Sequence, residues 1–198
     1  MEKNKINEFF RKSIHISNAI IPLGYIYLFQ DKIDMIIILS FFLIFCFFVE
    51  IFRKNNDLTS IIFSRYFGFM LRENEKKGAL TGATWVFVGA LFTILLIPPP
   101  FSILALLFLS VGDTCAAIIG MQFPFIRLGR KTLSGSLGGF IACIIIGLII
   151  DIPTISYDIL FFGAFMAMFI EIIPTTFDDN VTIPIFSGFS MYCFNMIV

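Results

Sequence analysis

An acidic residue and a basic loop lie close together between Val111 and Ser136, in the sequence VGDTCAAIIGMQFPFIRLGRKTLSGS. Asp113 falls within an apolar stretch, and Arg127, Arg130 and Lys131 follow in a loop rich in glycine and hydroxyl residues. A carboxylate can hold Mg²⁺, and such a loop can hold phosphates. This combination of residue types indicates nucleotide chemistry.

The segment GRKTLSGS, at 129–136, has the composition of a phosphate site and precedes an apolar segment. Glycines allow close approach of a ligand, and free N–H groups at the start of a helix favour anions. The spacing is not that of a GxxxxGK[ST] nucleotide-binding loop. The residues predicted to bind phosphates or to allow their approach are Gly112, Gly129, Arg130, Lys131, Thr132, Ser134, Gly135 and Ser136.

A second pair of acids lies further along the chain, at Asp178 and Asp179. Magnesium is usually held by one or two carboxylates together with the phosphates of the substrate. Phosphoryl transfer also needs positive charge near the transferred group, which Lys131 supplies. We therefore predict a Mg²⁺ site formed by Asp113 with Asp178 or Asp179.

The composition places these residues in a membrane protein. Hydrophobic residues make up 58% of the 198 residues, charged residues only 14%, and the mean hydropathy is +0.94. Soluble domains average roughly 45–50% apolar and about 25% charged residues. The four cysteines are scattered singly and there is one histidine, which argues against a zinc site or disulfides. No cleavable signal is expected, and no nucleic-acid partner.

The expected fold is an all-α, polytopic membrane helix bundle forming one integral domain over residues 1–198. A membrane-spanning helix needs about 20 apolar residues. About seven such spans are predicted, near 14–30, 34–52, 80–97, 101–120, 135–151, 157–174 and 182–198.

The polar segment 55–79 carries apolar residues at helical spacing. They are Leu58, Ile61, Ile62, Tyr66, Phe69 and Met70. This pattern favours an amphipathic helix on the membrane surface. A helix packed against the bundle remains the alternative.

The distribution of lysine and arginine predicts the orientation. With seven spans, every lysine and arginine except Lys32 falls on one side of the membrane. Because positive charge is enriched in cytoplasmic loops, the N-terminus is expected in the cytoplasm and the C-terminus on the opposite side. Four of these residues are interpreted as topology signals and contacts to lipid headgroups: Lys12, Arg72, Lys76 and Lys77.

The ionisable residues within the spans gather toward the same cytoplasmic end. A charge at the bilayer centre costs about 2.5–3.5 kcal/mol, so each one is a candidate site residue. Glu50, Asp113 and Glu171 lie near the cytoplasmic ends of three spans, and His15 opens the first. Glu50 could instead form only an interfacial ion pair with Arg53, and His15 could only cap its helix. Asp113 has no opposite charge within two helical turns, so it requires a distant partner or a ligand.

Several motifs together resemble a known family. They are RKSIH at Arg11–His15, Glu50 with Arg53, GALTGATW at Gly78–Trp85, GDTCAAIIG at Gly112–Gly120, GRKTLSGS at Gly129–Ser136, and Glu171 followed by DDNVTIP at Asp178–Pro184. The chain resembles the membrane family of dolichol kinase, phytol kinase and CTP-dependent diacylglycerol kinase, which is related to the phosphatidate cytidylyltransferases. The pair of motifs at Gly112–Gly120 and Gly129–Ser136 is the specific part of this resemblance.

The resemblance implies transfer of the γ-phosphoryl group of CTP to a membrane lipid alcohol at the cytoplasmic face. In this hypothesis Asp113 and Lys131 act in catalysis, and His15 or Glu171 orients or deprotonates the lipid hydroxyl. Arg53, with Glu50, orders the site or contacts the nucleotide. The alternatives are a phosphatidate cytidylyltransferase, whose longer PGHGG-type signature is absent, and a small transporter or non-catalytic membrane protein.

Overall fold

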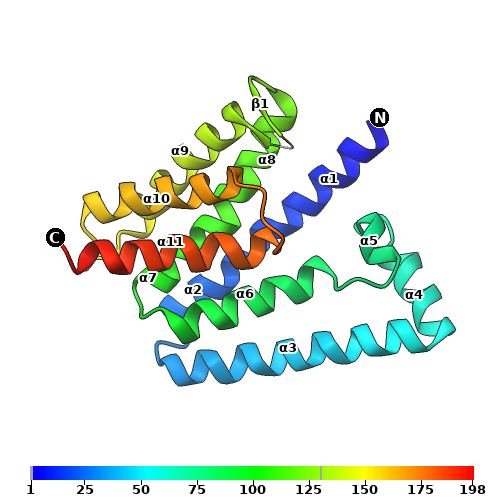
Figure 1. The fold of residues 1–198 in the computed structure, drawn as a ribbon. Coiled ribbons are helices and arrows are strands. Elements are labelled where there is room, and N and C mark those ends of the chain that lie inside the picture. Colours follow the sequence, from blue (N-terminus) through cyan, green and yellow to red (C-terminus); the bar gives the residue numbers. More distant parts are fainter. Residues whose placement is uncertain (1, 130) are drawn as a thin grey trace.

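The computed structural model describes residues 2–129 and 131–198, and it is built almost entirely from helices (Figure 1). A 3₁₀ turn, Ile16–Ala19, joins the first two helices, and strands β1 (Arg127–Leu128) and β2 (Lys131–Thr132) form a small antiparallel hairpin. The prediction of a helical fold is confirmed. The α-helices are α1 Glu2–His15, α2 Ile20–Tyr27, α3 Lys32–Asn55, α4 Asp57–Phe67, α5 Glu73–Lys76, α6 Gly82–Leu96, α7 Phe101–Leu107, α8 Thr114–Gln122, α9 Leu133–Ile150, α10 Tyr157–Ile172 and α11 Asp179–Asn195.

Within the described residues, three continuous helices are long and apolar enough to cross a membrane. They are Lys32–Asn55, Phe101–Gln122 and Leu133–Ile150. Helices also occupy the four other predicted spans, but α2, α6, α10 and α11 are each shorter than 18 residues. The chain therefore has the helices of a membrane protein, while the number of seven crossings stays a prediction.

The helix Phe101–Gln122 forms the centre of the bundle. In its apolar window 67% of the residues are buried, against 17% for Lys32–Asn55 and 22% for Leu133–Ile150. The central helix is therefore surrounded by protein. The other two expose apolar side chains, as helices in contact with lipid do.

A π-helical turn, Phe108–Asp113, interrupts the central helix between α7 and α8. Such a turn holds one more residue than an α-helical turn, and it is frequent at functional sites. Asp113 is its last residue. The irregular turn therefore sets the direction in which the side chain of Asp113 points from the helix.

The polar residues gather at one end of the bundle. The hairpin β1–β2, the carboxyl end of α10 and the amino ends of α6 and α11 lie toward this end, while the C-terminus lies at the other (Figure 1). Helices α6 and α11 pack closely because Gly89 has no side chain: a Cβ there would lie 1.9 Å from the carbonyl oxygen of Asn180. This close approach holds the start of α11 beside α6.

The polar segment 55–79 contains helices α4 and α5, as the expected surface helix requires. Helix α4 packs on α3, but four of its predicted apolar residues point away from the bundle: Leu58, Ile61, Ile62 and Tyr66. This face is therefore not packed against the protein. Its position at a membrane surface stays a prediction.

Candidate functional site

Asp113 lies at the centre of the polar end and is almost completely buried, with 2% of its surface exposed. Its Oδ2 atom forms an ion pair with the ammonium group of Lys12, and His15 Nε2 lies 3.4 Å from the same oxygen. The other oxygen, Oδ1, is buried and accepts no hydrogen bond from the described residues. The distant partner that the sequence required for Asp113 is therefore α1, and within this part of the chain Oδ1 keeps its capacity to bind a ligand.

Helix α1 brings Lys12 and His15 to the site on one face, because they are three residues apart. The helix packs against α8, where the hydroxyl of Thr114 lies 3.4 Å from the carbonyl oxygen of Lys12. Lys12 itself is buried. The interpretation of Lys12 as a topology signal missed this pairing. Its helical spacing from His15 was the signal that could have shown it.

The ammonium group of Lys131 lies among carboxylates from three helices. Its Nζ atom lies 2.6 Å from Glu171 Oε1, 2.9 Å from Asp179 Oδ2 and 3.9 Å from Asp113 Oδ1. Burial alone would lower the pKa of Lys131, but the three surrounding carboxylates raise that pKa above its ordinary value. The segment after Glu171 thus folds back toward the hairpin, and Lys131 stays charged.

The hydroxyl groups of the loop hold its backbone in place. Thr132 is the N-cap of α9 and accepts the N–H of Gly135 at 3.1 Å. Ser134 donates to the carbonyl of Phe123, and Ser136 donates to Glu171 Oε2 at 3.0 Å. These three predicted phosphate ligands are therefore engaged within the protein.

The predicted glycines have structural roles of two kinds. Gly129 has φ +64°, a left-handed conformation that glycine adopts without strain, and it forms the turn of the hairpin. A Cβ at Gly112 would lie 2.4 Å from Cys143 Sγ, so Gly112 allows close helix packing. Gly135 likewise lies against α8. The prediction for Arg130 lies outside the described residues.

The two neighbouring acids at the start of α11 have different partners. Asp178 is the N-cap of α11, accepting the N–H of Asn180 at 3.1 Å, and it forms an ion pair with Arg72 at 3.0 Å. Asp179 instead contacts Lys131. Of the two predicted metal ligands, Asp179 therefore lies closer to the cluster that contains Asp113.

No group of three histidine, cysteine, aspartate or glutamate side chains suited to a metal occurs within the described residues. Magnesium does not need such a group, because it often takes one or two carboxylates and completes its shell with phosphates and water. Asp113 Oδ1 and Asp179 Oδ2 both lie near the ammonium group of Lys131, and within the described residues Oδ1 accepts no hydrogen bond. These two carboxylates therefore fit a site of this kind.

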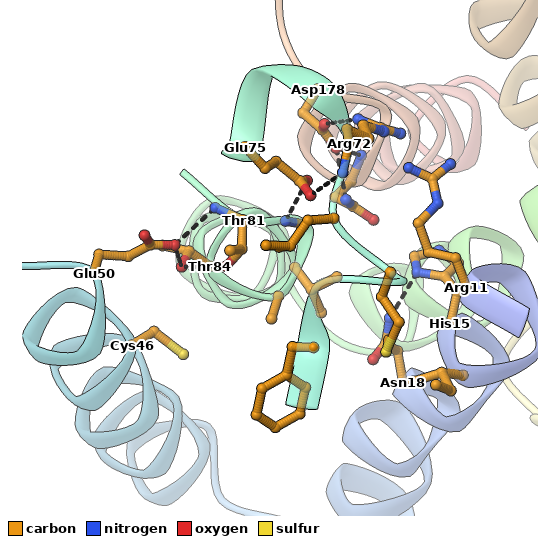
Figure 2. A pocket seen from close by; sticks show the side chains of 18 of the residues that line it. Arg11, His15, Asn18, Cys46, Glu50, Arg72, Glu75, Thr81, Thr84 and Asp178 are labelled. Carbon is orange, nitrogen blue, oxygen red and sulfur yellow. Dashed lines mark hydrogen bonds and ion pairs between the residues drawn. The ribbon is translucent and has the colours of Figure 1, made fainter. Parts of the chain in front are cut away.

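A cavity of about 520 Å³ lies between α1, α3, α4 and α6 (Figure 2). One part of its wall is apolar and includes Phe45, Val49, Phe63, Phe67 and Met70. The polar part includes Lys12, His15, Arg72, Asp113 and Asp178–Asn180. None of the described residues of the loop 127–136 lines it. The cavity and the basic loop therefore approach Asp113 from different directions.

Two buried carboxylates fix the wall of this cavity at the start of α6. Glu50 accepts the N–H of Thr81 at 2.7 Å and forms an ion pair with Arg53 at 2.6 Å. Glu75 accepts the N–H of Gly82 at 3.0 Å (Figure 2). Negative groups at a helix N-terminus satisfy its free N–H groups and its dipole. The geometry of Arg53 favours ordering the site over contacting a nucleotide.

Comparison with known proteins gives three distant relatives. An uncharacterized protein of Rickettsia prowazekii is 28% identical over 142 residues, covering 71% of this chain and 69% of that protein. CTP-dependent diacylglycerol kinase 1 of Schizosaccharomyces pombe is 28% identical over 147 residues, covering 70% and 64% of the two chains. The Saccharomyces cerevisiae protein of that name is 27% identical over 140 residues, covering 68% and 47%.

This chain is a distant homologue of CTP-dependent diacylglycerol kinases. The matched part spans about two-thirds of one yeast kinase and about half of the other. No family model matches the chain, and no solved structure is similar to it. The homology supports a lipid kinase of the membrane in general terms. The wider relationship to dolichol and phytol kinases and to cytidylyltransferases stays a prediction.

Proposed function

We propose that this protein transfers the γ-phosphoryl group of CTP to the hydroxyl of a membrane lipid alcohol. Diacylglycerol is the first candidate, because both yeast relatives are named for it. Dolichol or another polyprenol, and phytol, are the other candidates. One observation carries the proposal: Asp113 lies where a cavity with an apolar wall meets the ammonium group of Lys131.

The two substrates would approach Asp113 from its two sides. The lipid hydroxyl would enter the polar part of the cavity, with its chain against Phe63 and Phe67. The nucleotide phosphates would lie near Lys131 and the hairpin loop. The hydroxyl oxygen bonds to the γ-phosphorus, the bond from that phosphorus to the bridging oxygen breaks, and CDP leaves. Lys131 stabilises the negative charge on the transferred group.

The hydroxyl proton needs an acceptor, and His15 is better placed than Glu171. His15 lines the cavity, whereas Glu171 does not line it and is bound to Lys131 and Ser136. Asn18 Nδ2 lies 2.8 Å from His15 Nδ1, an arrangement that leaves the proton of a neutral ring on Nε2. His15 accepts a proton at Nε2 only if the Asn18 amide turns so that Nδ1 donates to it.

Magnesium, held by Asp113 and Asp179 with the phosphates, would neutralise charge on the β- and γ-phosphoryl oxygens. Asp178 remains a candidate ligand if its pairing with Arg72 is released. The residues of the protein orient the acceptor and keep water from the apolar part of the cavity.

We also propose the multi-pass arrangement that places this site at the cytoplasmic face, with the N-terminus in the cytoplasm and the C-terminus opposite. The gathering of polar groups around Asp113 and Lys131 supports it, as does the basic charge near α1, α4 and the hairpin.

The test is a phosphorylation assay of the purified protein in lipid vesicles with CTP labelled at the γ or the α position. We expect label from the γ position in the lipid, more with CTP than with ATP, and none in the Asp113→Asn variant. A panel of diacylglycerol, polyprenol and phytol identifies the acceptor. Label from the α position would instead show a cytidylyltransferase. Transfer to no lipid would refute the proposal.

A further inference from the structure

Helix α4 is apolar on two opposite faces. The outer face carries Leu58, Ile61, Ile62 and Tyr66, each more than half exposed. The inner face carries Phe63 and Phe67, which line the cavity. The remaining side of α4 carries Asp57, Ser60 and Ser64, and Arg65 lies on the outer face between Leu58 and Ile61. The protein covers only the inner face, so the exposed apolar side chains of the outer face require other apolar surroundings.

Helix α3, which directly precedes α4, also exposes apolar side chains. Only Asn56 separates the two helices, and α3 exposes a row of aromatic side chains that includes Phe41, Phe45, Phe48 and Phe52. An 11-residue helix is about 16 Å long, about half the thickness of the hydrocarbon core. Helix α4 is therefore too short to cross a bilayer, and it fits the interfacial layer.

The charges around α4 complement an anionic surface. Lys54, Arg65 and Lys77 are exposed around the helix. Lys76 is also exposed but pairs with Glu73 at 2.8 Å, and Asp57 begins the helix, so these four basic residues outnumber the two exposed acidic ones. A basic residue near an anionic membrane surface contributes about 1 kcal/mol of attraction. A helix with an apolar outer face and basic neighbours has the features of an interfacial membrane helix.

Arg53 and a long-range ion pair hold this segment: Arg53 lies 5.2 Å from the centre of the Phe63 ring and donates to the carbonyl of Glu75, and Arg72 pairs with Asp178. Arg72 Nη1 lies 3.0 Å from Asp178 Oδ2, linking the end of the α4–α5 connection to the start of α11 (Figure 2). The Arg72 side chain is about half exposed. Between Asn56 and this ion pair, α4 forms a wall of the cavity, with lipid expected on its other side.

We propose that α4 lies in the interface of an anionic phospholipid bilayer and is the gate through which the lipid substrate enters the cavity. The entry step rests on the proposed function, since the molecule that would enter the cavity is the acceptor lipid of the proposed reaction. The lipid would pass beside α4 from the membrane into contact with Phe63 and Phe67. Release of Arg72 from Asp178 would free the end of the α4–α5 connection, and movement of α4 itself also requires Phe63 to leave Arg53.

The position of α4 is testable without any activity. Trp85 is the one tryptophan of the chain, so Ile61→Trp in a Trp85→Phe background gives a single fluorescent reporter on the outer face. Asn74→Trp in the same background is the control, on the exposed part of α5. We expect brominated phospholipids to quench the reporter at 61 several-fold more than the control, and iodide to do the opposite. Quenching at 61 by iodide and not by brominated lipid would overturn the proposal.

The anionic preference is measured in the same samples. Vesicles of phosphatidylcholine with and without phosphatidylglycerol are compared. Deeper quenching at position 61 in the anionic vesicles supports the charge argument. Equal quenching in both would overturn the preference for an anionic bilayer.

The gate is tested by placing the same charge on two faces of α4. Ile61→Glu puts a carboxylate on the outer face, and Ser64→Glu puts one on the side of the same helix. We expect Ile61→Glu to raise the KM for long-chain diacylglycerol several-fold, with the KM for CTP and for a water-soluble short-chain diacylglycerol unchanged. Equal KM values for the long-chain lipid in both variants would refute the gate. Absence of any lipid phosphorylation by the unmodified protein would refute the proposed function, while the fluorescence result would still stand.

Discussion

Replacing Lys12 by methionine would leave Asp113 buried with a weaker set of partners. The side chain of Asp113 is 3% exposed, and of the described cationic groups only His15 and Lys131, at 3.4 and 3.9 Å, would remain near its carboxylate. Breaking a buried ion pair from one side costs about 3–5 kcal/mol. We expect Lys12→Met to fall near the lower end of that range, because these two groups compensate in part.

Replacing Asp113 by asparagine should cost more, toward 5 kcal/mol, because it leaves Lys12 without its partner. Within the described part of the chain, Lys12 forms no other ion pair. The double variant Lys12→Met with Asp113→Asn buries no unpaired charge at this position. It should therefore be more stable than Asp113→Asn alone, and the losses of the two single variants should not add.

The measurement combines unfolding of the purified variants in detergent with transfer of γ-label to lipid. We expect the double variant to recover stability and to remain inactive, because the carboxylate is needed for chemistry as well as for burial. Strictly additive losses of stability would refute the energetic reasoning. Recovery of activity together with stability would show that the pair is only structural.

Three further predictions concern residues around the site. Arg53→Gln should reduce stability by about 3 kcal/mol in unfolding assays and leave the KM for CTP unchanged, because Arg53 is bound within the protein; a large rise in that KM would show a nucleotide contact. Gly89→Ala should cost about 1–3 kcal/mol and reduce kcat, since its Cβ would push Asn180 and the start of α11 away from α6; normal kcat would contradict this coupling. The raised pKa of Lys131 keeps its ammonium group charged well past neutral pH. Any loss of activity between neutral pH and pH ~10 should therefore come from another group, and it should be seen in Lys131→Arg as well. If Lys131→Arg does not show that loss, deprotonation of Lys131 is its cause.

The sequence predicted the location of the site better than its contacts. Helical spans and the bias of basic residues are sufficient to place Glu50, Asp113 and Glu171 at one end of the bundle. The structure brings Asp113 and Glu171 to the same lysine, and the segment after Glu171 brings Asp179 to it as well. Glu50 instead holds the start of α6, at the wall of the cavity.

Contacts that depend on the register of a single residue could not be predicted in this way. Asp178 and Asp179 are neighbours in sequence, and only the exact start of α11 decides which one caps the helix and which one reaches Lys131. For Lys12 the sequence offered only a partial signal. Its spacing from His15 places both residues on one helix face, but a basic residue before a first span usually marks topology, and its burial depends on how α1 packs against α8.

The π-helical turn before Asp113 also sets a constraint on insertions and deletions. An α-helix rotates by about 100° per residue, and a π turn takes up one additional residue without that rotation. Loss of one codon between Phe108 and Asp113 would let the helix become regular while α7 and α8 keep their relative rotation. Insertion of a further residue would instead turn Asp113 away from Lys12 and Lys131. Single-residue insertions should therefore be more harmful here than single-residue deletions, although the segment is among the most apolar of the chain.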